Sequence, residues 1–284
     1  MIRRYINNAI QKVTLSATSF AVKASDIDSF PRGLEGSNRS YQKFIILGHQ
    51  RSGSSMMIGT LRTHPQIVGF GELFTVDSVG FNVEGYDNSS TRLLALRNKY
   101  PVEFLDRYIF SSYKEDIRSV GFKFFSEHIE RNNQFRCIWQ WLEANREIKV
   151  INLTRKNMLA AYTSLLIAMK DGRFGIRDKT ERSTTTVTID PKKCLAEFQQ
   201  RKVSHEETKQ YIRHHEVFDI IYEDMATDPH TYLKNIQQFI GTDIRDLKVT
   251  KVKQEMRSLS DVIENYDELR KFFRQTEWDY LFDM

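Results

Sequence analysis

The chain has 284 residues, of which 40% are hydrophobic, and a formal net charge of +5. This length and composition favour one large α/β domain with a substantial core over two small domains. The modest charge, with no basic stripe interleaved with aromatic residues, disfavours a nucleic-acid-binding protein. Cys137 and Cys194 have no CxxC spacing and no histidine partner at ligand spacing. We therefore expect no metal site and a reducing, cytoplasmic compartment.

Residues 1–40 are expected to form a partly helical extension followed by a polar linker. Arg3 and Arg4 precede an apolar-leaning stretch, but polar residues interrupt it. No run approaches the roughly 18 apolar residues of a membrane span, so no integral membrane span is predicted. An amphipathic helix lying on a membrane surface is the alternative. Residues 41–284 are expected to form the single main domain.

Residues 44–55, Phe-Ile-Ile-Leu-Gly-His-Gln-Arg-Ser-Gly-Ser-Ser, predict a strand, an anion-binding loop and the start of a helix. Helix N-termini offer unpaired N–H donors and about half a positive charge. Gly48 and Gly53 have the spacing of a nucleotide-binding P-loop, but Ser54 stands where that motif has lysine. The cation of the loop is instead Arg51. An ordinary nucleoside-triphosphate enzyme is therefore disfavoured, whereas an anionic donor with a group leaving near Arg51 is favoured; a purely structural turn is the alternative.

The next segment predicts a second strand that ends at an acidic residue. His64 and Pro65 mark the end of a helix of about nine residues. A short apolar run then leads to Glu72. We expect this strand to lie beside the first, with Glu72 emerging at its end.

Residues 50–55, His64-Pro65 and residues 71–74 together resemble the donor loop of sulfotransferases that use 3′-phosphoadenosine 5′-phosphosulfate (PAPS). The resemblance is strongest to the bacterial carbohydrate branch, which includes nodulation-factor and trehalose sulfotransferases, and it covers most of the chain from about residue 41. It implies a P-loop-like α/β domain whose loop holds the 5′-phosphosulfate. Strand candidates alternate with helical patterns, which independently predicts a central parallel sheet flanked by helices on both faces. The implied cofactor-binding residues of the loop are Arg51, Ser52, Gly53, Ser54, Ser55 and Met56.

A second strand–loop–helix unit supplies the other implied contact with the donor. Residues 148–153 are rich in β-branched residues and precede Arg155 and a long apolar helix over about 158–169. The family binds the 3′-phosphate of the donor with an arginine and a downstream serine, a role that the resemblance gives to Arg155 and Ser164. Thr163, at the more common spacing, is the alternative hydroxyl. A guanidinium and a neutral hydroxyl suit a phosphate dianion.

The later segments of the chain indicate secondary structure and loops, but few candidate catalytic or binding residues. Two inserts, near 75–116 and 171–216, are expected to shape the acceptor pocket. Asp190-Pro191 is a good N-cap and N1 pair for a charged helix, whose polar side chains we interpret as a solvated face. Residues 120–125 resemble a core strand of this family, and residues 218–224, followed by Pro229 and a helix to Gly241, resemble its late strand and helix, so the resemblance implies these elements here.

The resemblance implies a single in-line displacement at sulfur without a metal. Glu72 is predicted to be the general base and Arg51 to stabilise charge on the leaving phosphate; a helix-capping or salt-bridging role is the alternative for Glu72. His49 and His128 are expected near the cleft, more simply as packed or surface residues. The implied acceptor is a hydroxyl of a sugar, glycoconjugate or small natural product, with an amine left open. A P-loop-like kinase and a non-catalytic nucleotide-binding module are the other hypotheses, and the sequence leaves homo-oligomer formation open.

Overall fold

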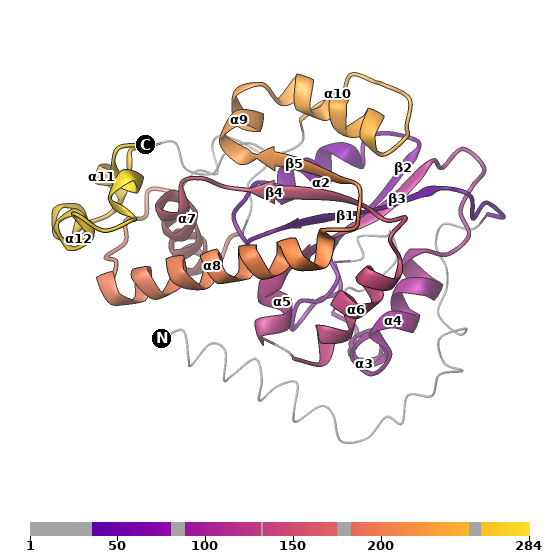
Figure 1. Cartoon of the computed structure of the whole chain (residues 1–284), viewed down its shortest axis with the longest axis horizontal. Coiled ribbons are helices and arrows are strands. Elements are labelled where there is room, and N and C mark those ends of the chain that lie inside the picture. The colour runs from indigo at the N-terminus through magenta and orange to yellow at the C-terminus, as the bar shows by residue number, and fades with distance from the viewer. Residues whose placement is uncertain (1–35, 81–88, 132, 175–182, 250–256) are drawn as a thin grey trace.

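A five-stranded parallel sheet in the order β2-β3-β1-β4-β5 forms the centre of the protein (Figure 1). The computed structural model describes residues 36–80, 89–131, 133–174, 183–249 and 257–284, so residues 1–35 of the predicted extension lie outside it. The predicted α/β fold class, with a P-loop-like parallel sheet between two layers of helices, is confirmed. The strands are β1 (Gln42–Gly48), β2 (Ile67–Glu72), β3 (Ser119–Phe125), β4 (Lys149–Thr154) and β5 (Val217–Ile221).

Helices cover both faces of this sheet (Figure 1). On one face lie α2 (Ser54–Leu61), α9 (Tyr222–Thr227) and α10 (Pro229–Phe239). The other face carries α3 (Thr91–Lys99), α4 (Pro101–Phe104), a π-helical turn (Leu105–Ile109), α5 (Ser126–Arg131), a 3-10 turn (Asn133–Arg136), α6 (Cys137–Ala144) and α8 (Pro191–Ile212). Beyond the strand ends lie α7 (Met158–Asp171), α11 (Leu259–Val262), α12 (Tyr266–Phe273) and a 3-10 turn (Asp279–Phe282).

The apolar run of β1 explains why this strand lies in the middle of the sheet. Side chains alternate between the two faces of a strand, and here both faces are apolar. Phe44 and Ile46 belong to the core under α2 and α10, whereas Ile45 and Leu47 belong to the core under α3 and α6. All four are at most 1% exposed. The loop after β1 is therefore anchored by a strand that is packed on both sides.

The expected pairing of the second strand with the first is wrong. In the structure β3 lies between them and pairs with both β1 and β2. The physical reason is burial: all seven residues of β3 are buried, so this strand takes an interior position, whereas β2 forms an edge of the sheet. Glu72 still reaches the carboxyl edge of the sheet, because it is the last residue of β2 and is paired in register with Lys123 of β3.

The strand order reverses at β1, which places a crevice at its carboxyl end. The chain adds β2 and β3 on one side of β1 and then β4 and β5 on the other. In open α/β sheets the loops diverge at such a switch point and ligands bind there. The loop after β1, the end of β3 and the loop after β4 therefore meet at one edge.

Helix α8 begins as predicted from the Asp190-Pro191 pair. The Asp190 carboxylate accepts the backbone N–H groups of Lys192 at 2.9 Å and Lys193 at 3.2 Å. Such a cap satisfies donors that the first turn of a helix leaves unpaired. Its inner side packs Phe198 against Phe273 of α12 and Trp278, so the helix is fixed beside the crevice.

The first of the two predicted inserts contributes mainly to the core. Within residues 75–116, the helices α3 and α4 bury Leu93, Leu96 and Phe104 against the sheet face that carries Ile45. Its part between 81 and 88 lies outside the described residues. The second insert supplies α8, which faces the site described next.

Candidate active site

The loop between β1 and α2 has the backbone conformation of an anion cradle. Arg51 and Gly53 both adopt left-handed conformations, with φ of 67° and 89°. Only glycine fits at position 53, because the Cβ atom of any other residue would lie 2.5 Å from a ring carbon of Tyr222. A left-handed arginine is uncommon and costs energy, which is typical of functional loops.

Several polar groups of this loop lack partners within the part of the chain that the structure describes. The backbone N–H groups of Gly53, Ser54 and Ser55 donate to no acceptor among the described residues, whereas Met56 N–H donates to Gly53 O at 3.0 Å. The Ser52 hydroxyl is buried and has no hydrogen-bond partner in this part of the chain. Buried unpaired polar groups are costly. The cradle is therefore suited to an anion that accepts these hydrogen bonds, and Met56 is not among its free donors.

Arg51 and Ser164, which the sequence placed in one site, are in direct contact. The Ser164 hydroxyl accepts hydrogen bonds from Arg51 Nε at 3.0 Å and Nη2 at 2.8 Å. Arg51 Nη1 donates to the carbonyl of Phe174 at 2.8 Å. Thr163, the alternative hydroxyl, is buried, and its Oγ1 has no partner among the described residues. The geometry therefore brings Ser164, and not Thr163, to the loop.

Arg155 lies on the other side of the loop, at the end of β4. Its Nη1 donates to the carbonyl of Arg51 at 2.8 Å, and its guanidinium stacks 4.6 Å from the ring centroid of Tyr222. The Glu223 carboxylate lies 3.8 Å from Arg155 Nε and also accepts the N–H groups of Lys156 and Asn157. Tyr222 and Glu223 lie in the first turn of α9, and their contacts fix the direction of Arg155.

The positive charges of Arg51 and Arg155 lie close together and favour the binding of an anion. Burial, and next the charge of Arg155, lower the pKa of Arg51 to about 10. Burial is also the main reason that the pKa of Arg155 is lowered. Both groups stay cationic at neutral pH, and they repel each other in a partly dehydrated crevice. A phosphorylated ligand placed between them would relieve that repulsion.

Glu72 lies in a network that reaches the same loop. Its carboxylate is 3.0 Å from Lys123 Nζ and 3.5 Å from His128 Nε2. Lys123 Nζ also donates to the Ser55 hydroxyl at 2.8 Å. His128 Nδ1 accepts the Phe125 N–H at 3.2 Å, so a neutral imidazole carries its proton on Nε2, toward Glu72. Lys123 thus connects the Glu72 carboxylate to Ser55 in the first turn of α2.

The Glu72 network holds this carboxyl group in its ionised form. Burial by itself would raise the pKa of Glu72, but the hydrogen bond from His128 and the charge of Lys123 lower it from 4.5 to about 2. For Lys123, burial lowers the pKa and the charge of Glu72 counteracts this. The pair is therefore ionised near neutral pH, and Glu72 can accept a hydrogen bond or a proton.

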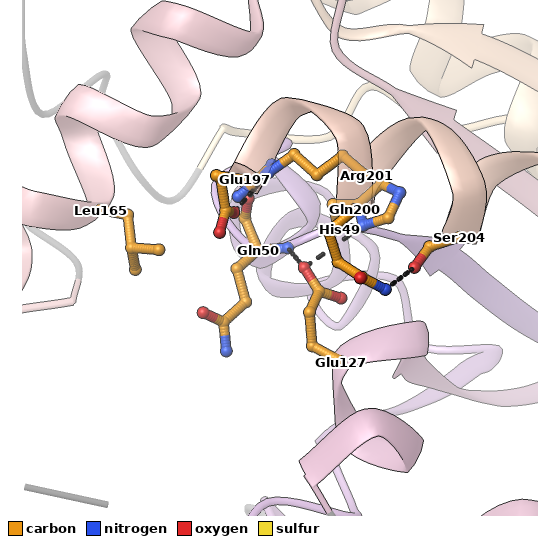
Figure 2. A pocket seen from close by; sticks show the side chains of 8 residues that line it. All are labelled: His49, Gln50, Glu127, Leu165, Glu197, Gln200, Arg201 and Ser204. Atoms are coloured by element: carbon orange, nitrogen blue, oxygen red, sulfur yellow. Dashed lines mark hydrogen bonds and ion pairs between the residues drawn. The ribbon is translucent and has the colours of Figure 1, made fainter. Parts of the chain in front are cut away.

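A second buried carboxylate supports the loop from the opposite side. Glu127 Oε1 accepts the Gln50 N–H at 3.0 Å and lies 3.3 Å from His49 Nδ1 (Figure 2). Burial opposes ionisation of Glu127, but the hydrogen bond and charge of His49, and next the charge of Arg201, lower its pKa to about 2. His49 and His128 are packed residues, as expected, but each packs against a carboxylate of the site.

The interpretation of the whole polar side of α8 as a solvated face is wrong for Arg201. This side chain is only 7% exposed; its Nε pairs with Glu197 at 2.8 Å, and its Nη1 donates to the carbonyl of Gln50 at 3.3 Å. The sequence shows only a charged helix, and the burial of one side chain depends on the loop that packs against it. Lys192, Lys193, Glu206, Glu207 and Lys209 are exposed, as predicted.

Two further searches concern the described residues only. They contain no group of three or more His, Cys, Asp or Glu side chains that could hold a metal ion. Within the same ranges, no helix combines the length and apolar character that crossing a membrane requires.

A strand–loop–helix unit at the carboxyl edge of a parallel sheet, with cations around the loop, defines a P-loop-like α/β protein. A family model described as the sulfotransferase family matches residues 43–246, which is most of the chain. The chain therefore belongs to the sulfotransferase family.

Two relatives and two solved structures are similar to the chain. Nodulation protein H of Rhizobium tropici is 26% identical over 250 residues, covering 86% of this chain and 94% of that protein. Nodulation protein H of Rhizobium meliloti (strain 1021) is 25% identical over 248 residues, covering 86% and 96%. A sulfotransferase from Alicyclobacillus acidocaldarius is 17% identical, with coverage of 82% and 91% and a TM-score of 0.45. Mouse sulfotransferase SULT7A1 complexed with PAP is 17% identical, with coverage of 89% and 67% and a TM-score of 0.37.

Proposed function

We propose that this protein transfers a sulfonate group from PAPS to a hydroxyl group of a sugar, a glycoconjugate or a small natural product. An amine would need the same base and is a variant of this proposal. One observation carries it: Lys123 links Glu72, at 3.0 Å, to Ser55 of the anion cradle, at 2.8 Å. A proton acceptor and a donor-binding loop are thus joined through one side chain. Membership of the sulfotransferase family supports the reaction class.

The residues of the loop fit the 5′-phosphosulfate of PAPS. The N–H groups of Gly53, Ser54 and Ser55 and the Ser52 hydroxyl, which have no acceptor or partner in the described ranges, supply donors, and Arg51 supplies charge. We assign Arg155 and Ser164 to the 3′-phosphate, because a guanidinium fork and a hydroxyl suit a dianion. Fixed cations and amides would then neutralise the donor, so the proposal includes no metal.

Each side chain has one task in the proposed displacement. Glu72 accepts the proton of the acceptor hydroxyl as its oxygen bonds to sulfur. Arg51 and the cradle amides stabilise the charge that develops on the 5′-phosphate oxygen as the bond from that oxygen to sulfur breaks. Lys123 keeps Glu72 ionised and directed toward the loop. PAPS supplies the sulfonate group, and 3′-phosphoadenosine 5′-phosphate (PAP) is the product.

Incubating the purified protein with ³⁵S-labelled PAPS and a panel of glycans and small alcohols tests this function. We expect a labelled product identified by mass, and the same rate in the presence of EDTA. Calorimetry with PAP measures donor binding separately. Tight PAP binding without any labelled product would instead favour a non-catalytic nucleotide-binding module. Labelling from γ-³²P-ATP that EDTA abolishes would favour a kinase.

Replacing Arg155 with lysine is expected to weaken PAP binding by about 10- to 100-fold, measured by calorimetry. Lysine keeps the charge but loses the fork and the stacking on Tyr222, and hydrogen bonds to charged groups contribute about 1.5–3 kcal/mol each. Arg118→Lys is the matched control, because Arg118 is exposed just before β3. An unchanged dissociation constant for Arg155→Lys would remove this residue from the donor site.

We also propose that the protein works in the cytoplasm. Both cysteines are free, and Cys194 is completely buried in the core between α7, α8 and α12. Free structural cysteines are typical of reducing compartments.

A further inference from the structure

The turn that opens the loop after β1 has an unfavourable backbone conformation at Arg51. The N–H of Ser52 donates to the carbonyl of His49 at 3.3 Å, so residues 49–52 form a β-turn. Arg51 is the third residue of this turn, and it alone among the four has a positive φ, of 67°. This is the pattern of a type II turn, which favours glycine or asparagine at the third position. An arginine there needs support from contacts outside the turn.

Three charged side chains hold three consecutive peptide groups of this turn. The Gln50 N–H donates to Glu127 of α5 at 3.0 Å, and the Gln50 carbonyl accepts from Arg201 of α8 at 3.3 Å (Figure 2). The next carbonyl, that of Arg51, accepts from Arg155 at 2.8 Å. The backbone of the turn is thus held from α5, from α8 and from the end of β4.

Arg201 acts on the peptide group that distinguishes the two common turn types. Types I and II differ in the orientation of the peptide group between the second and third residues, here Gln50 and Arg51. In the observed orientation the Gln50 carbonyl accepts a hydrogen bond from the Arg201 guanidinium. In the reversed orientation the Arg51 N–H would point toward that guanidinium, which has donors only and cannot accept it. Arg201 therefore favours the left-handed conformation of Arg51.

The position of the Arg201 guanidinium is itself fixed. The residue is 6% exposed, and its Nε donates to Glu197, one turn earlier on α8, at 2.8 Å. Phe198 anchors the same part of the helix against Phe273 and Trp278. A hydrogen bond from a cation to a carbonyl is also stronger than one from a neutral donor. Arg201 is therefore suited to offset the cost of the strained turn.

The conformation of the turn decides where the Arg51 guanidinium points. In the observed conformation this group donates to the Ser164 hydroxyl at 3.0 Å and 2.8 Å. The cradle N–H groups of residues 53–55 follow directly in the chain. We assign these groups to the donor, and Arg201 is connected to them through the Gln50 carbonyl.

We propose that Arg201 is a positioning residue for the donor site: it holds the Gln50 carbonyl and thereby keeps the turn in the conformation that binds an adenosine bisphosphate. This inference rests on the proposed function, because it concerns the binding of PAPS and PAP. A protein that populates its binding conformation only in part binds the ligand more weakly by that fraction. Removing the Arg201 hydrogen bond should therefore weaken donor binding without removing a group that takes part in the transfer.

The test compares Arg201→Met with Lys192→Met, which removes an exposed cation from the first turn of α8. By calorimetry we expect Arg201→Met to weaken PAP binding about tenfold, as for one hydrogen bond to a charged group, and Lys192→Met to bind as the unmodified protein. The KM for ³⁵S-PAPS should rise by the same factor. The kcat at saturating PAPS should change less than about twofold, because bound donor selects the competent turn.

Stability is measured in parallel by urea unfolding. Arg201 borders a polar cavity of about 200 Å³, so water can enter beside the shorter methionine side chain. If Arg201→Met does not fold, Arg201→Lys gives the same comparison, because one ammonium group cannot replace both contacts of the guanidinium. A merely structural role would lower the free energy of unfolding and leave PAP affinity unchanged.

An Arg51→Gly background separates positioning from a direct effect of the Arg201 charge. Glycine adopts the left-handed conformation without strain, so the turn no longer depends on Arg201. PAP affinity is lower in Arg51→Gly itself, because its guanidinium is lost, but adding Arg201→Met should lower it less than about twofold further. If Arg201→Met has the same effect in both backgrounds, Arg201 acts on the donor independently of the turn, and the proposal is overturned.

The possible failures are distinguishable. Unchanged PAP affinity in Arg201→Met, or a lower kcat with an unchanged KM for PAPS, overturns the positioning role, although sulfonate transfer by the unmodified protein stands. If PAP binding depends on Arg201 as expected but no sulfated product forms, the positioning role stands and the transfer function fails. Absence of PAP binding to the unmodified protein would overturn both.

Discussion

Replacing Glu72 with glutamine is expected to lower kcat for sulfonate transfer by a factor of about 10² to 10⁴, the usual contribution of a positioned general base. Glutamine keeps the size of the side chain and can still accept a hydrogen bond from Lys123, which lies 3.0 Å away. It cannot accept the proton of the acceptor hydroxyl. The measurement is steady-state transfer from ³⁵S-PAPS, with the affinity for PAP determined in parallel by calorimetry.

The affinity for PAP should stay the same in Glu72→Gln, because Glu72 is connected to the cradle indirectly, through Lys123 and Ser55. Glu207→Gln, an exposed change on α8, is the matched control and should retain full activity. If Glu72→Gln transfers sulfonate at the unmodified rate with PAP affinity preserved, Glu72 is not the base.

The pH dependence gives the same hypothesis a second test. Because the pKa of Glu72 is about 2, the group is fully ionised over the range in which the protein would be assayed. We therefore expect no acidic limb of kcat/KM from Glu72 between about pH 5 and 8. An acidic limb in this range that disappears in Glu72→Gln would contradict the low pKa.

The elements around the site were predictable because their signals are local. The strand–loop–helix unit at 44–55 combines an apolar run with small residues, and Asp190-Pro191 is a helix start that needs no other segment. The helix predicted over 158–169 is observed as Met158–Asp171. Its N-cap, Asn157, lies just after Arg155, so the local pattern also fixed the position of that arginine.

Strand order and buried charges were not predictable, because they depend on contacts between distant segments. Nothing in the sequence near Glu72 indicates that β3 separates β2 from β1. Lys123 stands inside the apolar run Gly-Phe-Lys-Phe-Phe, where it resembles an interruption of a core strand. The alternation of that strand turns Phe122 and Phe124 to one face and Lys123 to the face of α2, beside Ser55. A charged residue within a buried strand is itself a signal, because such a side chain is rarely buried without a partner of opposite charge.

Replacing Lys123 with methionine is expected to have the largest combined effect on activity and stability. Methionine fills a similar volume but leaves the Glu72 carboxylate without its main positive partner; the two side chains are 4% and 27% exposed. Breaking a buried ion pair from one side costs about 3 kcal/mol or more. Sulfonate transfer should also fall, because Lys123 links Glu72 to the loop. Urea unfolding and the transfer assay measure the two losses.

The loss of stability in Lys123→Met should depend on pH in a defined direction. In the unmodified protein the folded-state pKa of Glu72, about 2, is below its ordinary value of 4.5. Its ionisation therefore stabilises the fold fully above pH 4.5, and this contribution is lost as the pH falls through about 2. Without Lys123 the folded-state pKa of Glu72 rises, so the variant should be most destabilised above pH 4.5, and the difference from the unmodified protein should shrink as the pH falls from 4.5 toward about 2.

The double variant Lys123→Met/Glu72→Gln separates loss of the pair from loss of the lysine packing. Removing the second charge abolishes the unpaired carboxylate, so most of the lost unfolding free energy should return while transfer activity stays low. The pH dependence of stability that Lys123→Met introduces should vanish as well. Equal instability of the single and double variants at pH 8 would mean that Lys123 acts through its packing, and that the two groups form no energetically coupled pair.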